Sequence, residues 1–387
     1  MEEKLNIGLI GYKFMGKAHS SAFTQLPIYF GEEYRVNKKI ICGRNADSLG
    51  KAARQFGWEE QVKDYKELIK RDDIDIIDVT TPSNFHKEIV MEALEAGKHV
   101  FCEKPLALNV ADAREMLEAA NKSGVKHQIG FNYRFVPAIR LAKKMIDEDR
   151  LGRIYHFRAR YLQDWATSPD FPLTWRFDKS ICGSGALGDL GAHAIDLAHF
   201  LVGDIKTVTG MNETFIRQRP ILQGEGGLAA KAEKNAPLGD VTIDDATLFC
   251  AQFENGALGS FEMTRYAAGN KNGMFFEVNG EKGSVKFFFE RMNELMYCDY
   301  TNENETQGFT RIQTTDSMHS YAKYYYPAGH VIGYGDTFTC EMYEFIKAIK
   351  ENTKAMPGFE DGVKTAQVMD AVDLSIANRA WVNVKEI

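Results

Sequence analysis

Three side chains in this sequence of 387 residues have the chemistry to move the proton of an alcohol. Lys104 stands in Glu103-Lys104-Pro105, and Asp189 precedes His193 by four residues in the glycine-rich stretch 183–193. Residues at i and i+4 of a helix lie on one face about 5–6 Å apart, so Asp189 and His193 can act together. Histidine is suited to remove a hydroxyl proton near neutral pH, and lysine can stabilise the negative charge that develops on the oxygen. Asp189 either orients His193 or binds an adjacent hydroxyl.

A metal site is the alternative use of the same segment, with Asp189, His193, Asp196 and His199 as ligands. Side chains at positions 193 and 199 point in different directions around a helix, so these four groups do not converge on one ion. We therefore expect no metal.

A dinucleotide-binding pattern opens the sequence. The apolar run at residues 5–11 predicts a buried strand, and helical spacing begins at Phe14. Gly11 and Gly16 take the first and third positions of G-x-G-x-x-G, whereas Lys13 takes the second. Either the Lys13 ammonium pairs with a phosphate, or Lys13 points into solvent and the N–H groups of a remodelled loop bind the phosphates. The intact strand–turn–helix context, including Phe14 and Met15, argues against the third alternative, that no dinucleotide binds.

The end of the second predicted strand leaves the choice of dinucleotide open. An NAD enzyme usually has Asp or Glu here, to accept from the ribose 2′-OH. This sequence has Gly43 followed by Arg44, which could pair with a 2′-phosphate or stack on adenine. The residues lean towards NADP or dual use, and the cofactor is NAD or NADP.

Further candidates follow the later strands of the predicted parallel sheet. Strand carboxyl ends line the crevice of such a sheet, so residues placed there should border the cofactor. A plain β–α turn, with Asn84 as a helix cap, explains part of the pattern from Thr81 to His86. The cofactor-binding candidates on this rim are Thr81, Pro82, Asn84 and His86, then Glu103 and Lys104, then Asn132.

The predicted elements describe an α/β protein in two parts. Strand and helix alternate six times up to residue 131, which is typical of a doubly wound parallel sheet. Later segments alternate apolar and polar residues with period 2, which predicts an α+β domain with a large, mostly antiparallel open sheet. The expected domains are residues 1–131, which bind the dinucleotide, and 132–387, which bind substrate and form the oligomer.

Glu103-Lys104-Pro105, the dinucleotide pattern, TPxxxH at residues 81–86 and the stretch 183–193 resemble the glucose–fructose oxidoreductase/inositol dehydrogenase/MocA (Gfo/Idh/MocA) family of nicotinamide-dependent sugar oxidoreductases. The resemblance covers most of the chain. It implies a Rossmann fold, with the lysine of EKP beside the nicotinamide and the substrate hydroxyl, in a Lys–Pro peptide that is often cis. Hydride would pass from a secondary carbinol carbon to the nicotinamide while His193 takes the hydroxyl proton.

Aromatic and amide side chains suggest a sugar pocket. Tyr133, Gln163 and Trp165 are predicted to bind substrate together with the catalytic groups Lys104, Asp189 and His193, and Arg176 is predicted at the cofactor. The runs 161–165 and 175–176 are most similar to levoglucosan dehydrogenases and related enzymes that oxidise pyranosides at C3. This similarity implies a pyranoside or anhydrosugar as substrate. The alternatives are an inositol dehydrogenase, a keto-sugar reductase, or a non-catalytic regulator that senses dinucleotides.

Composition restricts the partners. The net charge of −7 argues against nucleic acid, whose phosphates require a basic surface. The six cysteines are dispersed without a CxxC pair, and the amino terminus shows no signal-peptide pattern, so a cytoplasmic protein with reduced thiols is expected. The absence of a long apolar stretch predicts no membrane span. The open sheet face favours a homo-dimer or homo-tetramer.

Overall fold

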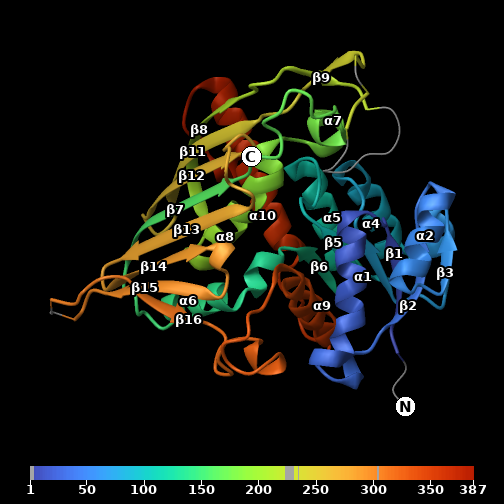
Figure 1. The fold of residues 1–387 in the computed structure, drawn as a ribbon, viewed down its shortest axis with the longest axis horizontal. Helices are drawn as coiled ribbons and strands as arrows, with labels where there is room; N and C mark the ends of the chain where they lie inside the picture. Colours follow the sequence, from blue (N-terminus) through green and yellow to red (C-terminus); the bar gives the residue numbers. More distant parts are fainter. Residues whose placement is uncertain (1–3, 223–230, 234, 303–304) are drawn as a thin grey trace. The chain divides into compact units, whose positions relative to one another are not determined.

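The computed structural model describes residues 4–222, 231–233, 235–302 and 305–387, and internal contacts divide the chain into two units (Figure 1). The first unit holds residues 1–135 and 321–364, and the second holds residues 136–320 and 365–387. The sequence analysis placed everything after residue 131 in one domain, whereas residues 321–364 pack with the first unit. The functional division into a dinucleotide-binding domain, 1–131, and a substrate-binding and oligomerisation domain, 132–387, stays a prediction.

The first unit is built on a parallel sheet of six strands in the order β3-β2-β1-β4-β5-β6. This is the doubly wound arrangement expected from the sequence, and the predicted fold class is confirmed. The short polar strand β3 was missed, because three residues with two polar side chains give no period-2 signal. The strands are β1 (Asn6–Ile10), β2 (Asn37–Cys42), β3 (Glu60–Val62), β4 (Ile76–Val79), β5 (His99–Glu103) and β6 (His127–Gly130).

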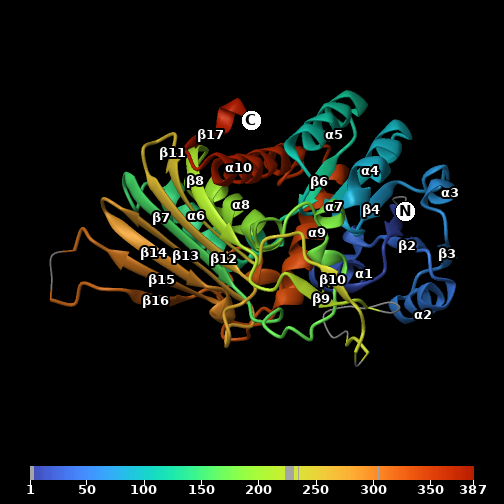
Figure 2. The same cartoon turned by 90° about the horizontal axis from the view of Figure 1, so that it is seen from above.

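Helices cover both faces of this sheet, with α4 and α5 on one face and α1 and α9 on the other (Figure 2). Local sequence sets several of their ends: the Asn45 and Asn109 side chains cap α2 and α5, which end at left-handed glycines 57 and 124. The helices are α1 (Phe14–Tyr29), α2 (Ala46–Phe56), α3 (Tyr65–Ile69), α4 (His86–Glu95), α5 (Val110–Ser123) and α9 (Tyr334–Lys350).

Helix α9 belongs to the hydrophobic core of the first unit. Its Phe338, Met342 and Phe345 are almost fully buried in the same cluster as Ile7 of β1 and Leu26 of α1. Aromatic rings from the segment before α9 pack on this cluster too, among them Tyr324 and Tyr325 against Phe30 and Tyr29. These two tyrosines are therefore packing residues of the first unit.

The second unit contains a nine-stranded mixed sheet in the order β16-β15-β14-β13-β7-β12-β11-β8-β17. Only the β7–β12 pair is parallel among its described ladders, so the predicted mostly antiparallel sheet is confirmed. The strands are β7 (Ile154–Leu162), β8 (Ile205–Glu213), β11 (Ala246–Phe253), β12 (Leu258–Thr264), β13 (Gly273–Gly280), β14 (Gly283–Phe288), β15 (Glu294–Asp299), β16 (Thr310–Gln313) and β17 (Val382–Asn383). Strands β9 (Gln218–Pro220) and β10 (Leu238–Asp240) form a separate antiparallel pair.

One face of the nine-stranded sheet packs on helices, and the other exposes alternate side chains. Helices α6 (Pro137–Asp147) and α8 (Ala192–Leu201) contact the sheet, and α7 (Lys179–Cys182) precedes the turn into α8. Helix α10 (Phe359–Asn378) runs from the first unit's segment into the second's. Tyr155, Leu248 and Leu258 are among the exposed residues of β7, β11 and β12. No helix formed by the described residues has the length and apolarity required to cross a membrane.

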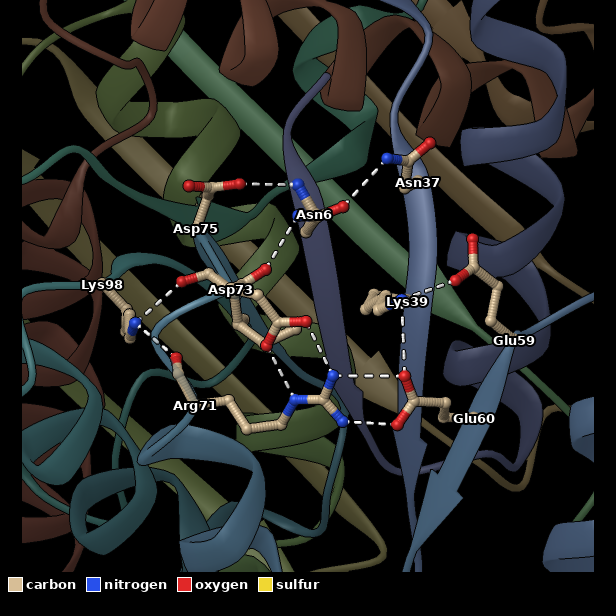
Figure 3. A network of polar contacts seen from close by, with 10 residues as sticks. Asn6, Asn37, Lys39, Glu59, Glu60, Arg71, Asp73, Asp75 and Lys98 are labelled. Atoms are coloured by element: carbon tan, nitrogen blue, oxygen red, sulfur yellow. Dashed lines mark hydrogen bonds and ion pairs between the residues drawn. The ribbon is translucent and has the colours of Figure 1, made fainter. Parts of the chain in front are cut away.

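Charged and amide side chains gather at the amino ends of strands in the first unit (Figure 3). The Arg71 guanidinium donates to Glu60 at the start of β3 and to Asp73, with Nη2 distances of 3.1 and 2.7 Å. The Lys98 ammonium donates to the backbone carbonyls of Arg71 and Ile74 at 2.8 Å. The network ties the loop before β4 to the sheet, at the edge opposite the predicted cofactor residues.

We expect Arg71→Ala to lower the free energy of unfolding by about 1 kcal/mol, because partly exposed ion pairs are individually weak. Arg71→Lys keeps the charge but loses the bidentate geometry, so its loss should be intermediate. Urea unfolding measures both effects. Dinucleotide affinity should stay within twofold of the wild type, and a larger change would contradict the separation of the two sheet edges.

Candidate active site

The predicted cofactor residues of the first unit lie together at the carboxyl edge of the parallel sheet. Each group follows a different strand: β1, β2, β4, β5 and β6. Parallel strands end at the same edge, so the gathering expected from the sequence is what the fold produces. The residues are Gly11, Lys13, Phe14, Met15, Gly43, Arg44, Thr81, Pro82, Asn84, His86, Glu103, Lys104 and Asn132.

The loop from β1 to α1 has the geometry of a phosphate-binding turn. Gly11 has φ +108°, and a Cβ there would lie 2.7 Å from Thr80 Oγ1, so the position requires glycine. The Thr80 hydroxyl donates to the carbonyl of Gly11 at 3.0 Å and holds the turn. Lys13 is exposed at the N-cap of α1, and the first turn of α1 has no acidic residue. An anion can therefore approach this helix N-terminus without meeting a carboxylate.

The Tyr12 ring covers Gly43 at the end of β2. A Cβ at position 43 would come within 2.2 Å of this ring. Arg44 is exposed, and its guanidinium carbon lies 5.5 Å from the centroid of the Phe85 ring. A planar cation beside an aromatic ring offers a surface on which a base could stack, or a charge for a phosphate.

The turn that carries Lys104 is held on both sides by buried groups. Its Lys104–Pro105 peptide is cis. The Lys104 N–H donates to Glu103 Oε2 at 3.1 Å. On the other side, the His86 ring lies 2.9 Å from the carbonyl oxygens of both Pro105 and Thr81. His86 is fully buried, and its ring joins the loop after β4 to the turn after β5. The sequence predicts this histidine as a cofactor-binding residue.

A buried acid–imidazole–acid array lies behind this turn. His19 of α1 is 0% exposed, with Nδ1 3.0 Å from both oxygens of Asp78 and Nε2 3.0 Å from Glu103 Oε1. Burial alone lowers the pKa of His19, but the charges and hydrogen bonds of Asp78 and Glu103 outweigh it and raise the pKa to about 10. Burial also raises the pKa of Asp78, against the opposing effect of His19. A proton is thus held between the two carboxylates at neutral pH.

Two predicted residues after β6 are also buried. The Asn132 side chain donates to Thr337 Oγ1 of α9 at 2.8 Å and is 3% exposed. Tyr133, predicted to bind substrate, is 2% exposed. Asn132 therefore fastens the end of the sheet to α9, a role that the sequence alone does not reveal.

In the second unit, Asp189 and His193 lie where a π-helical turn (Leu187–Gly191) passes into α8. The sequence predicts a regular helix from Asp189, whereas the structure has a π turn here. Such π turns are frequent at functional sites. Asp244 holds the start of this segment, because its carboxylate accepts from the N–H groups of Gly185 and Leu187 at 2.6 and 2.9 Å. His193 is 7% exposed, and Asp189 has a side-chain exposure of 32%.

The carboxylate of Asp189 is paired with a buried arginine. Arg265, 1% exposed, donates through Nη2 to Asp189 Oδ2 and to the carbonyl of Gly185, both at 3.0 Å. Its guanidinium lies 5.1 Å from the Trp165 ring centroid. Burial lowers the pKa of the neighbouring Arg176, while the charge of Asp189 raises it. Arg265 thus fixes the orientation of Asp189.

Hydrogen bonds connect the predicted substrate residues of the second unit. Trp165 Nε1 donates to Gln163 Oε1 at 2.8 Å, and Gln163 Nε2 donates to Asn272 Oδ1 at 2.8 Å. The Tyr161 hydroxyl donates to the same Asn272 oxygen at 2.7 Å, and the Tyr161 ring lies 6.1 Å from that of His193. The structure therefore brings Gln163, Trp165 and His193 into one polar and aromatic cluster.

Trp165 and Trp175 also pack beside a small core of the second unit, formed with Phe177. Both indole rings therefore have a packing role. Among the described residues, no group of three or more His, Cys, Asp or Glu side chains has the arrangement of a metal site.

Four supporting residues were missed by sequence reasoning: His19, Asp78, Asp244 and Arg265. Only Asp78 gives a visible signal, because an acid in the buried run Ile76-Ile77-Asp78-Val79 requires a partner. The partner is 59 residues away on α1, which no local pattern reveals. The other three follow from tertiary contacts.

Two family models match the chain. The model described as an oxidoreductase family with an NAD-binding Rossmann fold matches residues 5–131, and the GFO/IDH/MocA C-terminal domain matches residues 139–286. The chain belongs to the Gfo/Idh/MocA family. It is therefore an oxidoreductase with an NAD-binding Rossmann domain, and the resemblance found in the sequence is confirmed.

Relatives within the Gfo/Idh/MocA family match from end to end. A levoglucosan dehydrogenase from Pseudarthrobacter phenanthrenivorans is 41% identical over 388 residues, covering 100% of this chain and 99% of the relative. A structure of levoglucosan dehydrogenase in complex with NADH and levoglucosan is 40% identical with a TM-score of 0.93, covering 99% of this chain and 100% of that one. An oxidoreductase domain protein from Kribbella flavida is 46% identical with a TM-score of 0.94, covering 98% and 99%.

Gly185→Ala should destabilise the protein by about 1–3 kcal/mol, because an added Cβ would lie 1.8 Å from the Asp244 carbonyl oxygen and displace the segment that carries Asp189. Gly308→Ala is the control, since a Cβ there meets no described atom within 4 Å. Chemical unfolding measures both variants. Equal stability of the two would contradict the close packing at Gly185.

His19 should make stability depend on pH. Its folded pKa of about 10 exceeds the ordinary 6.5, so the folded state holds the extra proton between these values. The contribution is complete below pH 6.5 and is lost as pH rises through 10, by up to about 1.4 kcal/mol per pH unit. We expect urea unfolding between pH 6.5 and 8.5 to show a steeper decline for the wild type than for His19→Gln.

The pH range stops at 8.5 for a physical reason. Burial raises the pKa of the Cys42 thiol to about 12 and that of Cys102 well above its ordinary 9, so both thiols add a loss of the same sign at higher pH. Parallel slopes for the wild type and His19→Gln below pH 8.5 would show that His19 binds no extra proton in the folded state.

Proposed function

We propose that this protein is an NAD(P)-dependent dehydrogenase that oxidises a secondary hydroxyl, at C3, of a pyranoside or anhydrosugar. The observation that carries the proposal is the full-length similarity to levoglucosan dehydrogenase, at 41% identity. The chain has Lys104 at the carboxyl edge of its Rossmann sheet and the Asp189/His193 pair where a π turn passes into α8. The lysine, the carboxylate and the imidazole are the groups that proton removal from an alcohol requires.

The first unit fits a nicotinamide dinucleotide. The Gly11 turn and the N-terminus of α1 would hold the pyrophosphate, with Lys13, Phe14 and Met15 beside it. The Thr81 hydroxyl is buried and has no hydrogen-bond partner among the described residues, so it can take one from a ligand. Gly43, Arg44, Pro82 and Asn84 complete the surface, and Arg176 is a further candidate contact. When bound, the nicotinamide supplies the acceptor for the two electrons and the hydrogen of the substrate carbon.

The choice between NAD and NADP depends on Arg44. No carboxylate stands at Gly43 to accept from a ribose 2′-OH, and the Tyr12 ring covers this position. Arg44 can serve either cofactor: it pairs with a 2′-phosphate, or it stacks on adenine beside Phe85. A solved structure of levoglucosan dehydrogenase is a complex with NADH, which supports NAD. We propose NAD as the cofactor, with NADP as the alternative.

The chain's own groups would carry the proton. His193 accepts the hydroxyl proton, and the Lys104 ammonium donates a hydrogen bond to the same oxygen as negative charge develops. Asp189, kept in place by Arg265, orients His193 or accepts from an adjacent hydroxyl. Gln163, Trp165 and Tyr133 are the proposed sugar contacts. Glu103, His86 and Asn132 act indirectly, because each is buried and holds backbone or a neighbouring helix.

An inositol dehydrogenase or a keto-sugar reductase is the second candidate, favoured by relatives such as a myo-inositol 2-dehydrogenase from Thermotoga maritima, 27% identical over 386 residues. We also propose a homo-dimer or homo-tetramer, in which the exposed sheet face with Tyr155, Leu248 and Leu258 is buried. A cytoplasmic location is supported by the six cysteines, which are thiols in the structure.

The deciding experiment follows the reduction of NAD and NADP with levoglucosan, glucosides, free hexoses and inositols. Turnover of pyranosides, with a 3-keto product identified by NMR, supports the proposal. The preferred cofactor, compared between the wild type and Arg44→Ala, shows what Arg44 binds. Turnover confined to inositols supports the second candidate. Dinucleotide binding without turnover of any substrate contradicts both dehydrogenase assignments.

His193→Ala should lower kcat by about 10²–10⁴-fold, the usual contribution of a general base. The thermal unfolding midpoint and dinucleotide affinity should change little, since the first unit is untouched. His330→Ala, at an exposed position before α9, is the matched control and should keep wild-type turnover. Unchanged kcat in His193→Ala would remove His193 from the mechanism.

A further inference from the structure

The buried array of Asp78, His19 and Glu103 contains more charge than packing requires. Asp78 and His19 are 0% exposed and Glu103 is 5% exposed. Removing charges from water is unfavourable, and apolar residues of similar volume often replace buried ion pairs without loss of stability. Strand β4 is otherwise filled with isoleucine and valine here. The array therefore needs an explanation beyond stability.

The charge of the array follows from its geometry. Each ring nitrogen of His19 lies 3.0 Å from a carboxylate oxygen, and an ionised carboxylate only accepts hydrogen bonds. The ring must then donate from both nitrogens, or Asp78 must carry the proton that lies between it and Nδ1. Both distributions leave the array with one net negative charge. The other rings that pack on His19 among the described residues are those of Phe101 and Phe338, which carry no charge.

The array ends at Lys104. Glu103 uses one oxygen for His19 and the other for the backbone N–H of Lys104, so both oxygens of the carboxylate are fixed. Gly130, opposite Glu103 in β6, leaves the space for this carboxylate: a Cβ there would lie 2.9 Å from Glu103 Oε1. His86 holds the far side of the turn through the Pro105 carbonyl. The backbone on either side of Lys104 is thereby anchored to α1, β4 and α4.

We propose that His19 is a positioning residue for Lys104. The His19 ring binds both Asp78 and Glu103, and Glu103 in turn binds the backbone N–H of Lys104, so His19 holds the Lys104 turn in place for proton chemistry. This inference rests on the proposed function, in which Lys104 binds the reacting oxygen. Through Glu103, His19 determines where the Lys104 ammonium stands and which negative charge lies behind it. An array that has lost its shared proton would hold two carboxylates that repel each other, and the turn would move.

The test compares three variants. His19→Gln removes the shared proton, and His19→Gln/Asp78→Asn removes the histidine but keeps one negative charge and the possibility of hydrogen bonds along the array. His99→Gln is the matched control. His99 lies at the other end of β5, and its ring accepts a hydrogen bond from the backbone N–H of Lys126 at 2.9 Å. Thermal unfolding midpoints are measured for all four proteins.

We expect kcat of His19→Gln, at saturating cofactor and sugar, to fall at least tenfold, with KM for the cofactor within threefold. The pH profile of kcat should shift, because the imidazole that faces Asp78 from β4 and Glu103 and Cys102 from β5 in the wild type is absent. The double variant should recover kcat to within fivefold of the wild type. Loss of thermal stability in His19→Gln with unchanged kcat and pH profile would overturn the proposal, as would an equal loss of kcat in His99→Gln.

A readout without turnover separates this inference from the proposed function. Lysines of the folded proteins are acetylated with acetic anhydride, and the rate at Lys104 relative to Lys126 is measured by peptide mass spectrometry. We expect the ratio to change at least threefold in His19→Gln and to return in the double variant. The same ratio in every protein overturns the inference. A wild type that oxidises no sugar overturns the proposed function, while the labelling ratio still decides the role of His19.

Discussion

A charged group removed from water must find an opposite charge or a set of hydrogen bonds, and this requirement organises both units of the molecule. In the first unit, His19 links α1 to β4 and β5 through Asp78 and Glu103. In the second, Arg265 links the segment after β12 to the π turn through Asp189 and Gly185. Arg265 bonds directly to Asp189, and His19 reaches the backbone of Lys104 through one intervening residue, Glu103. The reactive groups are thus held by interactions that cannot be broken cheaply.

The sequence was sufficient to predict the fold class and the gathering of candidate residues at one edge of the parallel sheet. Period-2 and helical spacing placed most strands and helices, and the rule that parallel strands share a carboxyl edge placed Gly11, Arg44, Thr81 and Lys104 together. Glycine-rich spacing identified the segment of Asp189 and His193. These features are local, so a single sequence contains them.

What the sequence could not give depends on distant partners. His86 and Asn132 have residue types that suit a cofactor site, yet tertiary contacts bury both side chains. Arg265 follows a strand without any motif, and its importance comes from Asp189, 76 residues away. Strands β3 and β9 have three residues each, too short for a periodic signal. Family membership adds the chemistry, since the Gfo/Idh/MocA models match most of both units.

The return of α9 to the first unit has a consequence for synthesis of the chain. Phe338, Met342 and Phe345 fill the core around β1 and α1, although more than 300 residues separate them from Ile7. Domains generally fold as units while the ribosome releases the chain from its amino end. Here the amino-terminal dinucleotide-binding core stays incomplete until α9 has emerged. The part of the protein that is made first is therefore among the last to be finished, and its apolar surface must be protected in the meantime.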